Sequence, residues 1–327
     1  MSRVPSVLPA LIRGSPRTQL LRAASTSASA AATPNSSIAL SLPPSRNAAA
    51  SAKLPALHAR LNLHPSFPIE TLARTLVDPT AEADARFANT NLVSLGSTLT
   101  GFFAAEHLLV QYPRLPTEVF QAAVGAYVSH PALAAVGREW GVEAAFAPTA
   151  DVDAGLLQFA RLAPGSDPFR NRGKAVGLET ALANHVRAVF GGVYLHEGFA
   201  GAKQFFRQHI ASRKLDVERI FAFEQPTREL SRLCAREGFE LPVARLEAET
   251  GRRSRNAVFV VGVYSGNEKM GEGHGGSLDE ARTRAAVNAL KGWYLYSPVD
   301  KHLPSKTIEN PEAKFSKAYI DPGEVIV

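Results

Sequence analysis

The sequence predicts an α+β chain with two folded domains, an all-α domain at residues 62–215 and an α-β-β-β-α domain at residues 223–298. Two observations lead to this fold class. Apolar residues recur at helical spacing throughout the first region. In the second region, the β-branched run at 258–264 stands among shorter strand-like segments that lie between two helical patterns. The mixed pattern therefore indicates two domains in series.

The helices of the first domain are predicted from the spacing of their apolar residues. Between residues 89 and 110, Leu92, Leu95 and Leu99 recur three and four positions apart, which is the spacing of one helix face. Pro79 ends the first pattern, because proline cannot continue a helix. A loop is expected at 148–172, where proline and glycine gather. The predicted helices cover residues 67–78, 91–110, 117–129, 131–140, 174–196 and 199–210.

The second domain is expected to hold three strands between two helices. Ser277 and Glu280 have the spacing of a capping box, which predicts the start of the last helix. The tail at 299–327 is rich in proline and charge and predicts an extended segment. The predicted helices are 227–237 and 277–293, and the predicted strands are 245–250, 257–264 and 269–273.

The positive charge of the chain is concentrated at its N-terminus. Residues 1–69 hold seven Lys and Arg and no acid, and Glu70 is the first carboxylate. Serine, alanine and arginine without acid are typical of an organelle import signal, so residues 1–50 are interpreted as a mitochondrial transit peptide. Plastid targeting and a disordered basic tail are the alternatives. The remainder has 29 basic and 30 acidic residues, a net charge of −1, so global charge says little about nucleic acid.

Composition excludes two further classes of protein. Cys234 is the only cysteine, so neither an internal disulfide nor a cysteine-rich metal cluster is possible. The most apolar stretch, at 92–110, is interrupted by Ser94, Ser97 and Glu106, so no membrane span is expected.

Two motifs of the helical domain resemble the ribonuclease III family. The segment NTNLVSLGSTL at 89–99 is similar to the family's signature helix, and RAVFGGVYLHEG at 187–198 is similar to its second motif. Gly96 is expected to permit close helix approach, and the leucines are expected to fill the core. The α-β-β-β-α unit that follows resembles a double-stranded RNA-binding domain, in the order that the family has.

The resemblance implies a nuclease fold without a nuclease centre. Family enzymes hold Mg²⁺ with two carboxylates on each motif helix, because Mg²⁺ prefers anionic oxygen. The matching positions here are Val93, Ser97, Asn184 and Arg187, and none is acidic. No acid lies between residues 89 and 105, so a shifted alignment does not supply one. We therefore expect no enzyme activity, no catalytic residue, no metal and no cofactor.

The resemblance also implies which residues of the second domain face RNA. Arg252, Arg253 and Arg255 stand in the loop between the first two strands, which in the family enters a minor groove. The alternative for these arginines is a solvated turn. Glu229 matches the polar contact of the first helix, although a helix-surface carboxylate is equally consistent.

The third RNA-contacting region of such domains is altered here. Leu278 and Asp279 replace two phosphate-contacting lysines at the start of the last helix, while Arg282 and Arg284 remain. Residues 223–298 hold 11 basic and 10 acidic residues, which predicts poor affinity for generic duplex RNA. The glycine-rich stretch that precedes this helix follows a strand of an antiparallel unit, so it is not interpreted as a nucleotide loop.

In the family the signature helix also lies in a dimer interface. The apolar residues that could serve either the core or a partner are Leu92, Leu95, Leu99, Phe102 and Phe103.

An import signal, this domain pair and an empty centre together resemble the mitochondrial large-subunit ribosomal proteins of the L-forty-four family, called L-three in fungi. This resemblance implies a structural role in the mitochondrial matrix, on the large ribosomal subunit. The expected partners are its rRNA, neighbouring proteins and a second ribonuclease III-fold protein in a heterodimer. The alternatives are the inactive half of a heterodimeric RNA-processing endonuclease and a free adaptor for double-stranded RNA.

Overall fold

The computed structural model describes residues 48–145 without 83 and 85, 152–163, 165, 173–299, 303–310 and 312. The predicted transit peptide therefore lies outside the described residues up to residue 47, and so does most of the predicted tail.

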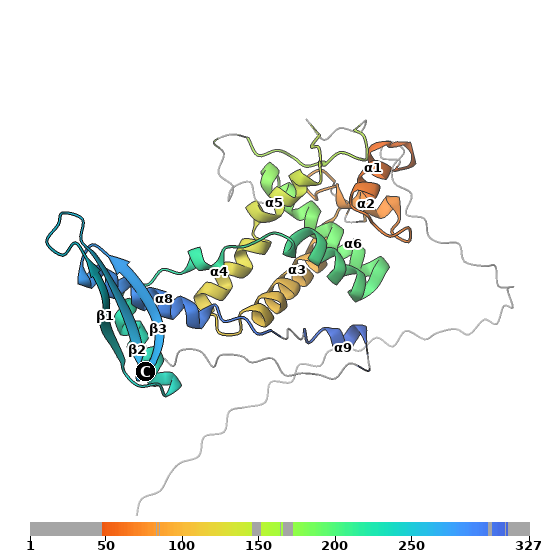
Figure 1. The fold of residues 1–327 in the computed structure, drawn as a ribbon. Helices are drawn as coiled ribbons and strands as arrows, with labels where there is room; N and C mark the ends of the chain where they lie inside the picture. The colour runs from red at the N-terminus through yellow and green to blue at the C-terminus, as the bar shows by residue number, and fades with distance from the viewer. Residues whose placement is uncertain are drawn as a thin grey trace, which may run out of the picture. The chain divides into compact units, whose positions relative to one another are not determined.

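The first domain is all-helical, as predicted (Figure 1). The helices α3 and α6 form its centre, and α1, α2, α4 and α5 pack around them. Phe67, Phe159 and Phe190 are among the largest fully buried side chains of its core. The elements are the short 3-10 helix η2 (Ala48–Ala50), α1 (Lys53–Arg60), α2 (Ile69–Thr75), α3 (Thr90–Gln111), α4 (Thr117–Val128), α5 (His130–Glu139), α6 (Leu178–Phe206), the π-helical turn η3 (Arg207–Ala211) and the 3-10 helix η4 (Val217–Ile220).

The helical domain begins upstream of residue 62. Leu54, Leu57 and Leu61 lie in its core, at 0%, 5% and 0% exposure. The Ser51 hydroxyl donates to the Asp153 carboxylate at 2.6 Å, which ties the start of this segment to a loop a hundred residues later. The helix α1 was not predicted, because its alanine-rich, acid-free composition continues that of the preceding residues.

The helix α6 contains a sharp break at Gly198. The backbone there has φ 73° and ψ −167°, in the left-handed half of the φ range, which glycine adopts without strain. This break separates the two helices that were predicted at 174–196 and 199–210. Phe205 and Phe206 after the break pack on Phe190 before it, with ring centroids 4.9 and 6.4 Å apart. The break thus lets one segment cover two sides of the core.

The second domain has the predicted α-β-β-β-α order. It consists of α7 (Pro226–Glu237), β1 (Pro242–Thr250), β2 (Val258–Ser265), β3 (Glu268–Gly275) and α8 (Leu278–Tyr294). The strands form an antiparallel sheet in the order β1-β2-β3, in which Val261 pairs with Leu246 and Gly273. The helices α7 and α8 pack against the sheet through Leu230, Leu233 and Leu290.

The strand β3 lies unusually close to α8. A Cβ on Gly271 would be 2.7 Å from the Ala285 carbonyl, and one on Gly275 would be 2.8 Å from the Ala281 amide nitrogen. Gly273, between them, faces the same helix, where a Cβ would overlap the Ala285 amide nitrogen. Glycines two apart on a strand thus meet alanines four apart on a helix. The glycine-rich stretch serves packing, in line with the sequence interpretation that it is not a nucleotide loop.

Two segments, Thr90–Gln111 and Thr117–Glu139, are long and apolar enough to cross a membrane by length and composition alone. This is weak evidence, because core helices of soluble proteins pass the same test. The second segment is divided into α4 and α5 at Ser129, whose backbone is extended with φ −62° and ψ 159°.

A short part of the C-terminal tail contacts α3. The backbone amide and hydroxyl of buried Ser305, which precedes α9 (Lys306–Glu309), donate to the Glu106 carboxylate at 2.7 and 2.6 Å. Glu106 had been noted only as a charge that interrupts an apolar run.

Candidate functional site

The two motif helices cross at a pair of glycines. A Cβ on Gly96 of α3 would overlap the carbonyl of Arg187 on α6, and a Cβ on Gly191 would overlap the carbonyl of Leu92. Only glycine fits at either position, which confirms that Gly96 permits close helix approach. The crossing brings the backbones of α3 and α6 together beside the positions at which the resemblance expects metal ligands.

None of these four positions carries a carboxylate. Val93 is half-buried and Ser97 is exposed on α3, while Asn184 and Arg187 are half-buried on α6. Within the described residues, no group of three or more His, Cys, Asp or Glu could hold a metal ion. Valine offers no ligand and arginine repels a dication, so this donor set does not fit Mg²⁺.

Arg187 instead connects α6 to the junction of α4 and α5. Its guanidinium donates to the Val128 carbonyl at 3.0 Å and to Nε2 of His130 at 3.2 Å. Burial lowers the pKa of Arg187. Burial and then the Arg187 charge lower the pKa of His130, so this ring is neutral and can accept the bond. A cation at the C-terminal end of α4 also faces the negative end of the helix dipole.

Asn184 contacts the carboxylate nearest to it, that of Asp78. Its Nδ2 donates to Asp78 Oδ2 at 3.4 Å. The other oxygen of Asp78 accepts from the Thr80 amide at 3.0 Å and from its hydroxyl at 2.7 Å. This buried carboxylate therefore organises a turn. Sequence analysis used Asp78 only to mark the end of a helix, and the Asp-Pro-Thr order was the available signal for a turn.

The apolar residues proposed for a partner interface divide into two groups. Leu92 and Phe103 are 5% and 2% exposed and belong to the core. Leu95 and Leu99 are half-buried, and Phe102 is 47% exposed. The surface group therefore consists of Leu95, Leu99 and Phe102, which we name the α3 stripe.

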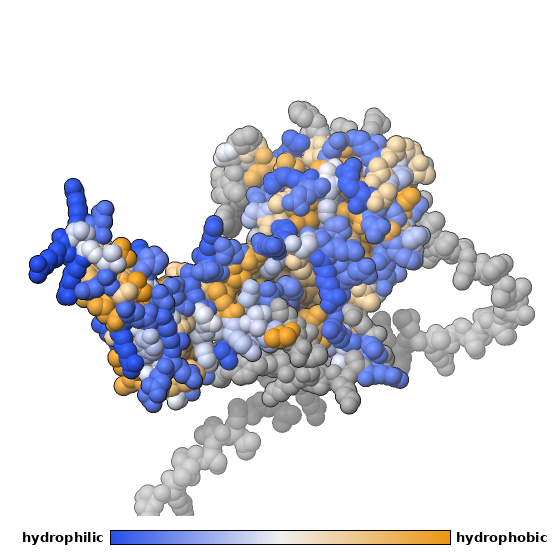
Figure 2. Space-filling view, viewed as in Figure 1, coloured by the Kyte–Doolittle hydropathy of each residue, from blue (hydrophilic) through white to orange (hydrophobic). Residues whose placement is uncertain are grey.

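The arginine loop between β1 and β2 is fully exposed. Arg252, Arg253 and Arg255 project from the end of the sheet, where Figure 2 shows a hydrophilic protrusion. The Ser254 amide and hydroxyl donate to the Gly251 carbonyl at 2.8 and 2.7 Å, which closes a turn and spreads the arginines. Arg252 forms a long surface ion pair with Glu249 at 3.5 Å, a kind of contact that contributes little.

Side chains of α8 and its cap already bond to the polar groups at the start of this helix. The Glu280 amide donates to Ser277 Oγ at 3.2 Å, which confirms Ser277 as the cap of the helix. The Glu280 carboxylate accepts from the Gly276 amide at 2.9 Å, one residue before the position that a capping box would use. The same carboxylate pairs with Arg284 at 2.6 Å, and Arg284 also donates to the His274 carbonyl at 2.8 Å. Both Arg282 and Arg284 are exposed, but the bonds of Arg284 hold it within the domain.

Glu229 lies near the start of α7. Its carboxylate accepts from the backbone amide of Gln225 at 3.3 Å. This contact closes the first turn of the helix, which fits the helix-surface alternative and leaves the side chain half-buried.

Helices that cross at paired glycines, followed by an α-β-β-β-α domain, define the class of protein: a ribonuclease III-like domain joined to a double-stranded RNA-binding domain. The family model of the MRPL44 dsRNA-binding domain matches residues 221–319. Large ribosomal subunit protein mL44 of Neurospora crassa is 41% identical over 90% of this chain and 85% of that protein. The chain belongs to the mL44 family.

More distant similarity extends to ribonucleases. Ribonuclease 3 of Symbiobacterium thermophilum is 27% identical over 62% of this chain and 78% of that enzyme. Among solved structures, the nuclease domain of ribonuclease III from Campylobacter jejuni is 17% identical, with a TM-score of 0.35 over 48% of this chain and 94% of that one.

Proposed function

We propose that this chain is a structural constituent of the large subunit of the mitochondrial ribosome, in which a ribonuclease III fold serves as a building block without catalysis. Membership of the mL44 family supports a mitochondrial, ribosomal location. The observation that carries the loss of catalysis is Arg187. A half-buried guanidinium occupies a position at which the related enzymes need a carboxylate, and it is bonded to Val128 and His130.

The RNA contact is proposed for the arginine loop. Arg253 and Arg255 are exposed and form no ion pair with another residue that the structure describes, so their charge is available to phosphates. The start of α8 is a weaker candidate, because Glu280 already occupies the Gly276 amide and Arg284. The proposed RNA contact therefore uses the loop, with Arg282 as an accessory cation. Glu229 is proposed only to cap its own helix.

A protein partner is proposed for the α3 stripe. Phe102 packs edge-on against Phe103 and Phe199, with ring centroids 5.6 and 6.1 Å away, and still leaves nearly half of its surface exposed. Exposed aromatic surface of this kind is typical of protein interfaces. A second ribonuclease III-fold protein is the proposed occupant, since the resemblance places a dimer interface on this helix.

Sedimentation of a mitochondrial lysate tests the proposal against its rival. The lysate is run on a sucrose gradient at moderate salt, with and without EDTA, and the chain is detected by immunoblotting. Co-migration with the large subunit, retained after EDTA separates the subunits, is the expected result. A peak at the top of the gradient, together with a partner that carries the four carboxylates, would favour the inactive half of a processing endonuclease.

A further inference from the structure

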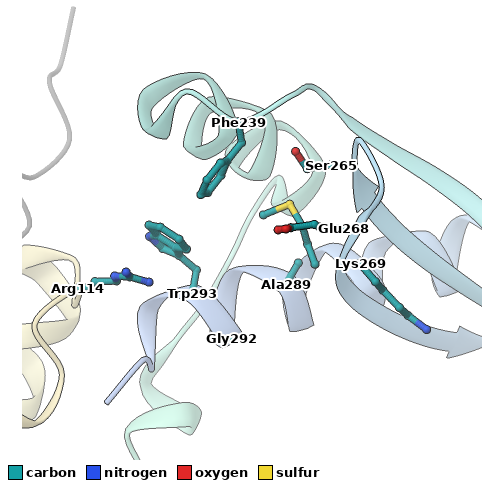
Figure 3. A pocket seen from close by; sticks show the side chains of 9 residues that line it. Arg114, Phe239, Ser265, Glu268, Lys269, Ala289, Gly292 and Trp293 are labelled. Atoms are coloured by element: carbon teal, nitrogen blue, oxygen red, sulfur yellow. The ribbon is translucent and has the colours of Figure 1, made fainter. Parts of the chain in front are cut away.

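A pocket of about 250 Å³ opens on the second domain, beside the turn between β2 and β3 (Figure 3). Its apolar walls are Phe239 and Trp293, which meet edge-on with ring centroids 5.3 Å apart at 86°. Phe239 is 41% exposed, which is a large apolar surface to leave in water. Six of the residues that line the pocket carry the argument: Phe239, Ser265, Glu268, Met270, Gly292 and Trp293.

The floor of the pocket is left open by a glycine. A Cβ on Gly292 would meet no atom within 4 Å, although the residue lies inside α8. Glycine in a helix costs about 1 kcal/mol relative to alanine, so it has no conformational advantage there. Unlike the glycines of β3, Gly292 is not required by packing against a neighbour. What it provides is space.

The charge available at the rim is negative. Glu268 lines the pocket, and Glu240 lies over the same turn, with its carboxylate 2.9 Å from a Cβ built on Gly266. Neither carboxylate forms an ion pair with another residue that the structure describes. Two cations also line the pocket, and both are engaged: Lys269 pairs with Glu247 and Glu272 at 2.7 Å each. Arg114 stacks on Trp293 and Tyr296, with its guanidinium carbon 3.8 and 4.3 Å from the ring centroids.

The pocket and the arginine loop lie at opposite ends of β2. The loop at 251–257 precedes this strand, and the turn at 266–267 follows it. One end of the domain thus carries free cations, and the other carries an aromatic pocket with free carboxylates. The cations of the first end attract phosphate, whereas the carboxylates of the second end attract a cationic side chain.

We propose that this pocket is a docking site for a basic, extended segment of a neighbouring protein. An aliphatic side chain of the segment packs in the pocket against Phe239 and Trp293, and a flanking Lys or Arg pairs with Glu268 and Glu240. The inference rests on the proposed function in one respect: the partner is expected on the same ribosomal particle. It assigns protein binding to one end of a domain whose other end is proposed to bind RNA.

A peptide titration of the full-length chain tests the chemistry. Trp140 and Trp293 are the only two tryptophans, so the Trp140→Phe variant leaves Trp293 as the sole fluorescent reporter. The probe is the amide of N-acetyl-Arg-Leu-Arg-Leu-Arg, and the control replaces each arginine by glutamate. We expect a saturable change in fluorescence with the basic peptide and at least tenfold weaker binding of the acidic one.

Matched variants separate the pocket from the rest of the chain. Gly292→Leu adds an apolar side chain at the lining of the pocket, where a Cβ meets no atom within 4 Å, and should abolish binding. Glu268→Lys should weaken binding at least tenfold. Simultaneous replacement of Arg252, Arg253 and Arg255 by Ser should leave it unchanged. Unaltered binding by the Gly292→Leu variant, or no saturable signal from the basic peptide, would overturn the proposal.

A crosslink inside the particle tests the partner. Benzoylphenylalanine is incorporated at Phe239 of the full chain, and purified large subunits are irradiated. The expected product joins the chain to a basic segment of another protein. A crosslink to rRNA, or none, would sink the docking site while leaving the ribosomal assignment intact. Absence of the chain from the subunit fraction, with peptide binding unchanged, would count only against the proposed function.

Discussion

The crossing of α3 with α6 and the contact of β3 with α8 are the two places where the resemblance to the ribonuclease III family implies functional groups, and the two places share two features. Each keeps the glycines that let two backbones touch: Gly96 and Gly191 in one, Gly273 with its neighbours in the other. At each, the side chains that stand where the resemblance implies catalytic or RNA-binding groups form bonds within the chain. Arg187 holds Val128, and Glu280 caps its own helix.

This comparison teaches that packing and chemistry can be lost separately. A glycine at a backbone contact cannot be replaced without moving an element, because atoms already occupy the place of a Cβ. A carboxylate that no longer holds a metal is a charged group with no partner, and a replacement that forms hydrogen bonds is favoured. On the proposed function, the fold therefore persists without the catalysis.

The largest effect is expected from a methyl group at the helix crossing. Gly96→Ala would overlap the Arg187 carbonyl, and we expect a loss of about 3 kcal/mol or more in the free energy of unfolding. Gly101→Ala is the matched control in the same helix, since its Cβ meets nothing within 4 Å. It should be neutral or stabilise by up to about 1 kcal/mol. Urea denaturation measures both, and equal effects would contradict the crossing.

The family's own residue at position 187 should be harmful here. Arg187→Glu removes the bonds to Val128 and His130 and sets a half-buried carboxylate against a carbonyl, so we expect a loss of about 2–3 kcal/mol. Arg187→Lys keeps the charge and should lose less. Thermal denaturation with and without Mg²⁺ measures the change. If the glutamate variant were as stable as the parent, or were stabilised by Mg²⁺, the centre would not have been rebuilt around arginine.

A methyl group should be tolerated less well at Gly273, where β3 contacts α8, than at Gly276, which follows β3. Gly273→Ala would push a methyl into the Ala285 backbone, and we expect about 2 kcal/mol of destabilisation. Gly276→Ala is the matched control, because the nearest atom to its Cβ is 3.6 Å away. Denaturation monitored by Trp293 fluorescence reports on this domain when Trp140 is replaced by Phe. A neutral Gly273→Ala variant would show that β3 can move away from α8.

Acid should act on the helical domain through a buried histidine. His185 is fully buried, and burial lowers its pKa to about 4, against an opposing bond to the Thr75 carbonyl. As pH falls, the unfolded state binds the proton before the folded state does. The contribution of neutral His185 to stability is therefore present above about pH 6.5 and is lost as pH falls toward 4. At pH 5 the loss is about 2 kcal/mol. His185→Gln should flatten this part of the pH profile of urea denaturation; an unchanged profile would exclude His185 as its source.

The elements that sequence analysis predicted are those whose signals are local. The spacing of Leu92, Leu95 and Leu99 predicted α3, and the β-branched run at 258–264 predicted β2. The absence of carboxylates at the four expected metal positions was also visible in the sequence, because it depends only on residue types at fixed spacing. The new bonds were not, because the contact of Arg187 with Val128 joins residues 59 positions apart. The same holds for Ser305 and Glu106, which are 199 positions apart.

The smallest change in free energy, but the one most specific to function, is expected in RNA binding. Replacement of Arg252, Arg253 and Arg255 by Ser removes three exposed cations. Binding to a transcript of the mitochondrial large-subunit rRNA should weaken roughly tenfold near 0.1 M salt, and the slope of log K against log salt should fall by about two to three. Arg284→Ser is the control from the other former centre, and it should change affinity less than about twofold, because Glu280 already neutralises this arginine. Filter binding across a salt series measures both. If Arg284→Ser weakened binding as much as the loop variant, the start of α8 would still be a phosphate site, and the parallel between the two centres would fail there.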